Sequence, residues 1–113
     1  MKKYFLVSVI LIGLGCVSKN KAPENLMTKQ EMINFLIDLH IVEAKISLSR
    51  IPTDSVKLFF PEIEDELYQK HHINDSIYKK SYQYYLNNIS QMEEIYSAVV
   101  DSLSLRERIM NRQ

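Results

Sequence analysis

The apolar residues of this chain recur at three- and four-residue steps, which places them on one face of an α-helix. No stretch alternates apolar and polar residues as a half-buried strand would, and no Asn-Gly or Asp-Gly hairpin turn occurs. The 113 residues include only two Gly and three Pro, which excludes collagen-like and low-complexity chains. The sequence therefore predicts an all-α fold, a small bundle of about four short helices.

Capping residues and prolines predict the boundaries of the first two helices. A capping box at Thr28–Glu31 predicts the start of the first helix, which we expect to end near Leu48, ahead of Pro52. The second helix is expected to start near Asp54. We expect it to kink or break at Pro61, because proline removes an amide donor and crowds the preceding turn.

The remaining boundaries follow from similar signals. The second helix is expected to stop at His71–His72, and Asn74–Ser76 offers N-caps to a third helix. Asn87 and Asn88 tolerate the left-handed conformation and are expected to end that helix. A second capping box, Ser90–Glu93, is expected to begin the last helix, whose charged tail at Arg106–Arg108 is expected to fray.

The amino terminus has the build of a secretory signal peptide. The basic segment Met1–Lys3 precedes an uncharged apolar run, Tyr4–Leu14. As a helix this run would rise only about 16 Å, against about 30 Å of membrane hydrocarbon. It is too short to span the membrane, so a permanent transmembrane anchor is disfavoured. The run ends in Gly13–Gly15 and Cys16, which resembles the lipobox of bacterial lipoproteins, in which the cysteine is lipidated and becomes the first mature residue.

The lipobox resemblance implies three parts in the chain: a lipoprotein signal peptide at residues 1–15, the lipidated Cys16 with a flexible tether at residues 16–26, and a helical domain at residues 27–113. Neither an Asp at position 17 nor an acidic cluster follows the cysteine, so by resemblance we expect the periplasmic leaflet of the outer membrane. The alternative is that Cys16 is an ordinary buried thiol.

Charge and cysteine content exclude several classes of partner. Fourteen Lys and Arg balance fourteen Asp and Glu, and no basic block occurs beyond the first three residues, so a nucleic-acid partner is disfavoured. A single cysteine closes no internal disulfide and, without a His pair at ligand spacing, builds no structural zinc site. We therefore expect no metal and no cofactor.

Three motifs behind the lipobox carry a resemblance to a known family. Asp38–Ala44, Tyr78–Tyr85 and Met92–Tyr96, in this order, resemble an uncharacterised bacterial lipoprotein family, domain of unknown function four-two-nine-six. The resemblance implies a helical lipoprotein and assigns no activity. The chain departs from the family at His72, where we would expect a glycine in a left-handed turn, so a histidine there implies strain or another cap.

One polar cluster could carry chemistry. His40 and Glu43 lie three residues apart on one helical face with Asp38 nearby, and they could form half of a metal site or an acid–base pair. A local or interhelical hydrogen bond is the favoured interpretation. The adjacent His71 and His72 point about 100° apart and cannot both bind with one face. The common catalytic motifs do not occur, so we expect a protein that is not an enzyme.

A row of tyrosines offers a second candidate site. Tyr78, Tyr82 and Tyr85 lie at i, i+4 and i+7, and an exposed row of this kind could stack sugars or peptide. The favoured alternative is packing in and beside the core, with hydroxyls that reach the surface.

Three Asp-Ser-aliphatic triplets resemble an O-glycosylation sequon of exported bacterial proteins. Their serines are Ser55, Ser76 and Ser102. For the first two, Asp and Ser are also ordinary residues at a helix start, and the third is expected to lie within a helix.

Two function classes remain. The favoured one is a membrane-tethered, non-catalytic periplasmic domain that binds an envelope protein, with a hydrophobic groove between helices as its binding surface. The alternative is a binder of small ligands or glycans that uses the tyrosine row.

Overall fold

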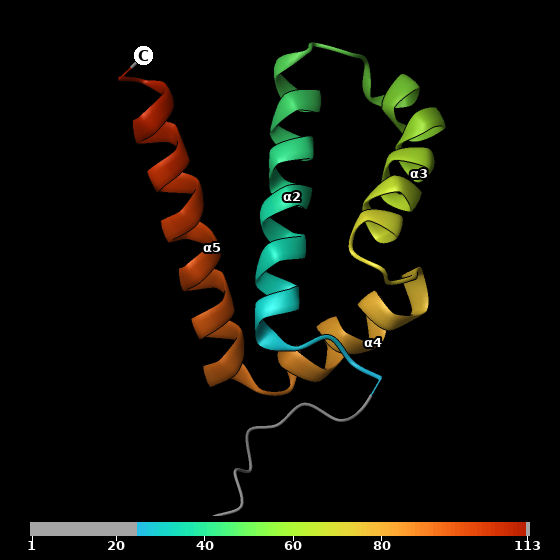
Figure 1. Cartoon of the computed structure of the whole chain (residues 1–113). Helices are drawn as coiled ribbons and strands as arrows, with labels where there is room; N and C mark the ends of the chain where they lie inside the picture. The colour runs from blue at the N-terminus through green and yellow to red at the C-terminus, as the bar shows by residue number, and fades with distance from the viewer. Residues whose placement is uncertain (1–24, 113) are drawn as a thin grey trace, which may run out of the picture.

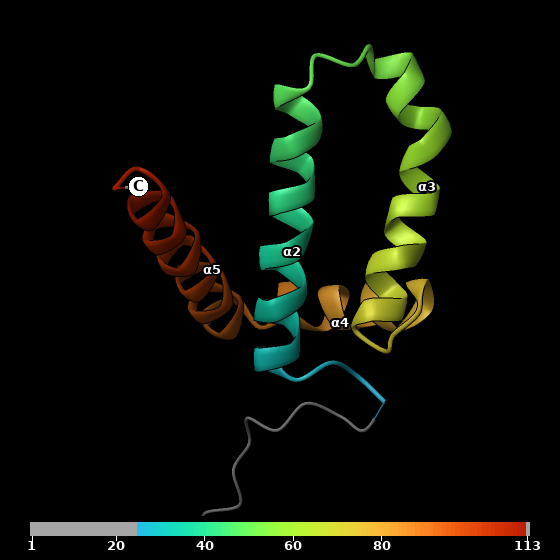
Figure 2. The ribbon, with the colours of Figure 1, turned by 45° about the horizontal axis from the view of Figure 1, so that its top comes forward.

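The computed structural model describes residues 25–112, and these form four α-helices (Figure 1). They are α2 (Lys29–Leu48), α3 (Thr53–Lys70), α4 (Asp75–Leu86) and α5 (Ile89–Met110). Helices α2 and α3 form an antiparallel pair, α4 crosses at the lower ends of both, and α5 runs back up beside α2 (Figures 1 and 2). The predicted all-α, four-helix fold is confirmed, whereas the signal peptide, Cys16 and most of the tether lie outside the described residues.

The start of α2 is fixed by the expected capping box. The Thr28 hydroxyl accepts a hydrogen bond from the Glu31 amide at 3.1 Å, and the Glu31 carboxylate accepts one from the Thr28 amide at 3.2 Å. Two backbone donors that a helix start leaves free are thereby satisfied. The helix ends at Leu48, as its sequence predicts.

Helix α3 runs through Pro61 without interruption, so the break expected there is wrong. Proline cannot donate to the carbonyl four residues earlier, that of Lys57. Both residues are exposed, so water can satisfy this carbonyl, and the missing bond costs less than it would in the interior.

Helix α3 ends in the left-handed turn that the sequence predicts at His72. His72 has a φ of 55°, and its amide donates to the Gln69 carbonyl at 3.2 Å. The Ile73 amide donates to the Tyr68 carbonyl at 2.9 Å, which completes a Schellman motif. A histidine in this conformation costs about 1–2 kcal/mol, which explains why glycine is expected at the position.

Helix α4 begins as expected but ends differently. The Asn74 side chain accepts a hydrogen bond from the Ile77 amide at 2.8 Å, which confirms the predicted cap. The predicted left-handed ending is wrong, because Asn87 and Asn88 have φ values of −81° and −125°. Instead, the Asn88 side-chain amide donates to the Tyr84 carbonyl at 2.6 Å and satisfies a free acceptor of the last turn.

Helix α5 departs from the sequence prediction at its start. It begins at Ile89, so Ser90 lies inside its first turn and the expected capping box at Ser90–Glu93 is wrong. The helix continues through Arg106–Arg108 to Met110, and the fraying expected of this tail stays a prediction.

The buried core lies at the end of the molecule where α4 crosses, which we call the closed end. Its members are Met27, Met32, Phe35, Leu36, Ile37, Leu67, Tyr68, Tyr85, Met92, Ile95 and Val99. In the described part of the chain, α2 contributes no fully buried residue after Ile37 and α5 contributes none after Val99. The opposite end, where α2 and α5 finish and α3 begins, we call the open end.

Two side chains of α4 hold the backbone of Met27 at the closed end. The Met27 amide donates to the Ser81 hydroxyl at 2.9 Å, and the Tyr85 hydroxyl donates to the Met27 carbonyl at 2.8 Å. The Ser81 hydroxyl in turn donates to the Ile77 carbonyl at 2.6 Å. All of these groups are satisfied without water, so the segment that leads into α2 is fastened to α4.

Replacing Tyr85 by Phe removes the donor to the Met27 carbonyl and leaves that buried acceptor unsatisfied. We expect Tyr85→Phe to lower the free energy of unfolding by about 1–2 kcal/mol, measured by urea denaturation. The matched control is Tyr84→Phe, since no hydrogen bond to the Tyr84 hydroxyl is found within the described residues. Equal losses in the two variants would contradict the role of the Met27 contact.

Candidate functional site

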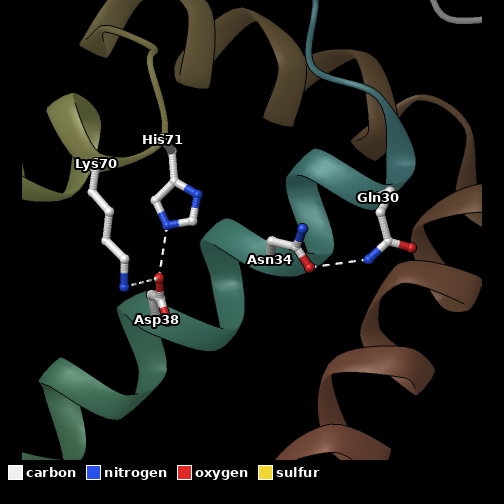
Figure 3. A network of polar contacts seen from close by, with 5 residues as sticks. All are labelled: Gln30, Asn34, Asp38, Lys70 and His71. Carbon is white, nitrogen blue, oxygen red and sulfur yellow. Dashed lines mark hydrogen bonds and ion pairs between the residues drawn. The ribbon is translucent and has the colours of Figure 1, made fainter.

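Asp38 is the centre of a polar contact between α2 and the end of α3. Its Oδ2 atom lies 2.8 Å from the Lys70 Nζ atom and 2.8 Å from the His71 Nε2 atom (Figure 3). Burial alone would raise the pKa of Asp38, but the hydrogen bonds and charges of Lys70 and His71 outweigh it and lower the pKa. The carboxylate is therefore ionised and ties the two helices together.

The same face of α2 continues as a polar stripe toward the closed end. The Gln30 side-chain amide donates to the Asn34 oxygen at 3.0 Å, one turn before Asp38 (Figure 3). These side chains hydrogen bond to each other or to α3, so the stripe is a structural feature of the helix pair.

The structure separates the predicted cluster of Asp38, His40 and Glu43. The His40 Nδ1 atom lies 3.3 Å from the Glu43 Oε2 atom on an exposed face, which is the local contact that we favoured. Asp38 instead pairs with His71, which is an interhelical contact of the kind favoured above, although the sequence did not identify His71 as its partner. Asp38 and His71 are 33 positions apart in the sequence, so no local spacing could identify them as partners. Among residues 25–112, no three His, Cys, Asp or Glu side chains lie close enough to hold a metal ion.

The tyrosine row is used mainly for packing. Tyr85 is buried and bonded to Met27, while the Tyr78 ring lies 4.6 Å from the Phe35 ring between their centres. The Tyr82 hydroxyl lies 3.3 Å from the Tyr96 hydroxyl. The three rings therefore do not form an open stacking face.

Burial and hydroxyl contacts also change the acidity of these tyrosines. Desolvation is the main cause that raises the pKa of Tyr78 to about 12. The hydrogen bond to Tyr82 is the first cause, ahead of burial, that raises the pKa of Tyr96 to about 12. Both hydroxyls are therefore protonated at neutral pH and act as hydrogen-bonding groups.

The three serines of the Asp-Ser-aliphatic triplets lie in different environments. Ser76, in the first turn of α4, is exposed. Ser55, in the first turn of α3, and Ser102, in the middle of α5, are half-buried. Ser76 is therefore the most accessible of the three to a modifying enzyme.

The open end carries two hollows, one on each side of α2. The hollow between α2 and α5 has a volume of about 410 Å³, and its apolar lining consists of Ile41, Ala44, Leu48, Leu103 and Met110. The hollow between α2 and α3 has a volume of about 400 Å³ and includes Ile46, Ile51 and Phe60 in its lining. Apolar helix faces that pair at the closed end thus stay accessible at the open end.

Because folding lowers the pKa of Asp38, its carboxylate stabilises the fold above the unfolded pKa of about 3.9. This contribution is lost as the pH falls through the folded pKa. We expect Asp38→Asn to lower the free energy of unfolding by about 1–2 kcal/mol at pH 7. The difference from wild type should shrink below about pH 4, as measured by denaturation at a series of pH values.

The control for Asp38→Asn is Glu43→Gln, which removes the exposed pair with His40 and is expected to cost less than about 0.5 kcal/mol. A difference between Asp38→Asn and wild type that stays constant from pH 7 to the acid limit would contradict the ionised pair.

Comparison with known proteins gives one match. The family model described as "Domain of unknown function (DUF4296)" matches residues 23–109, from just before the capping box to the last turn of α5. No curated protein and no solved structure matches the chain. Within the described residues, no helix is long and apolar enough to cross a membrane.

Proposed function

Because this chain belongs to the family described as "Domain of unknown function (DUF4296)", we propose a function from the chemistry of its own residues. We propose that the protein is a lipid-anchored, non-catalytic component of the bacterial cell envelope whose helical domain binds another protein. Two features support the proposal: the sequence up to Cys16 and the apolar surface at the open end.

The anchor rests on the first sixteen residues. A basic start, the short apolar run Tyr4–Leu14 and small residues before Cys16 are the chemistry of a lipoprotein signal. Several acyl chains on one cysteine hold a protein stably on a bilayer, at about 0.8 kcal/mol per buried methylene. Position 17 is Val rather than Asp and no acidic cluster follows Cys16, which favours the periplasmic leaflet of the outer membrane.

The binding role rests on the hollow between α2 and α5. Its lining is mainly apolar, and Leu48 and Met110 at its edge are 83% and 70% exposed. Large apolar side chains gathered on a surface mark sites of protein interaction, and a groove between two helices suits the apolar face of a further helix. The tyrosine row lacks a comparable opening, so the geometry favours a protein partner over a glycan.

The anchor is tested by expressing the full-length chain in a Gram-negative host, as wild type and as Cys16→Ala. We expect the wild type to begin at Cys16, to gain the mass of two or three acyl chains and to partition into membranes, because the lipid supplies the membrane affinity. Intact mass and membrane fractionation provide the measurement. An unmodified wild-type chain, or an acyl mass gain that persists in Cys16→Ala, would contradict the anchor.

A further inference from the structure

The open end of the domain is basic, whereas the rest of the described chain is acidic. Residues 44–57 and 102–112, which end α2, begin α3 and end α5, hold six Lys and Arg and two Asp and Glu. The remaining described residues, 25–43 and 58–101, hold four Lys and Arg and eleven Asp and Glu. The formal charge is therefore +4 at the open end and −7 elsewhere, and such a separation turns the open end toward an anionic surface.

The basic side chains of the open end are not used to hold the fold together. They are Lys45, Arg50, Lys57, Arg106, Arg108 and Arg112, and all six are exposed. Among residues 25–112, none of the six lies within ion-pair distance of an Asp or Glu carboxylate. Of the four basic residues elsewhere in the described chain, three form ion pairs: Lys29, Lys70 and Lys79. The positive charges of the open end are thus available to a partner.

Exposed apolar side chains lie among these charges at the end of α5. The apolar pair Leu105 and Ile109 and the basic pair Arg108 and Arg112 are each four residues apart, which places all four on one face of the helix end. Leu105 and Ile109 are 55% and 51% exposed. The end of α5 is therefore apolar and basic on the same face.

The turn after α2 adds the same two kinds of side chain. Arg50 is exposed, and its neighbour Ile51 is 40% exposed. This turn and the end of α5 both lie at the top of Figure 1, so one flat surface laid across that end meets both. We call Arg50, Ile51 and the four residues of the α5 face the basic tip. None of the six lines the hollow between α2 and α5, so the basic tip is separate from the proposed protein-binding surface.

We propose that the basic tip docks on the anionic lipid headgroups of the bilayer that holds Cys16. The inference rests on the proposed lipid anchor and goes beyond the proposed protein-binding role. Basic side chains beside exposed apolar ones are the pattern by which helices lie in a membrane interface, with the charges at the headgroups and the apolar groups below them. A tip built from two separate parts of the chain fits a flat bilayer better than it fits a single helix of a protein partner.

The tether is long enough for this docking. Cys16 and Asn25 are nine residues apart, which corresponds to at most about 30 Å of extended chain. Helix α2, with 20 residues, rises about 30 Å from the closed end to the open end. The bilayer that holds Cys16 is therefore within reach of the basic tip. Because the anchor already keeps the domain at the bilayer, a few weak contacts are enough to populate the docked state.

Docking is tested with the full-length lipidated chain in vesicles of phosphatidylcholine, alone or with about one third phosphatidylglycerol. The sequence contains no Trp, so Ile109→Trp supplies a single fluorescent probe in the basic tip. We expect its emission to shift to shorter wavelength, and to be quenched by brominated lipid, in the anionic vesicles only. Raising the salt concentration should reverse the shift, because salt screens the attraction. The matched control is Ile89→Trp, at the other end of the same helix and 70% exposed, which is expected to show no shift.

Charge variants identify the residues that dock. In the Ile109→Trp chain, Arg108→Gln with Arg112→Gln is expected to lower the ratio of docked to undocked protein about thirtyfold, which corresponds to about 2 kcal/mol. Lys79→Gln with Lys80→Gln removes the same amount of charge from α4, at the closed end, and is expected to leave the ratio unchanged.

The proposal is overturned by an Ile109→Trp emission that is the same in both kinds of vesicle, by an equal shift at Ile89→Trp, or by equal losses in the two charge variants. A shift that follows protein density instead of lipid charge would make a second copy the occupant, and a shift that requires added membrane proteins of the host would make it another protein. Both results would also overturn the docking on lipid. The acyl mass on Cys16 is measured before reconstitution, so failure of the anchor is distinguished from failure of the docking.

Discussion

The hydrogen bonds that hold the Met27 backbone between Ser81 and Tyr85 are the contact on which the rest of the fold depends. They join residues 54 and 58 positions apart, and they are buried, so leaving them unmade would cost the full desolvation of the Met27 amide and carbonyl. Because these bonds hold Met27, just before α2, against α4, the short helix α4 crosses at the closed end. The apolar residues of the three long helices then gather at the closed end.

This arrangement divides the described domain into an end that holds the buried core and an end that carries accessible apolar hollows. The chain enters the domain at the closed end, next to the segment that leads back to Cys16. The 20-residue helix α2 rises about 30 Å from there, so the hollow beside Leu48 lies far from the point of attachment. The proposed anchor and the proposed binding surface can therefore act without competing for the same face.

The helices could be predicted from the sequence, but the contacts between them could not. The caps at Thr28–Glu31 and Asn74 are local hydrogen bonds, so residue spacing is enough to predict them. The break expected at Pro61 is wrong, because the cost of a proline inside a helix depends on exposure, which residue spacing does not reveal. The pairing of Asp38 with His71 depends on how the α2–α3 hairpin closes, and no pattern within either helix indicates it.

The central claim is that stability is concentrated at the closed end and that the open end is left for a partner. Amide hydrogen exchange of the purified full-length chain in detergent tests it most directly. The account predicts the slowest exchange at Phe35–Ile37 and Ile95–Val99. It predicts faster exchange at Leu103–Met110. Exchange at Leu103–Met110 as slow as at Ile95–Val99 would contradict the account.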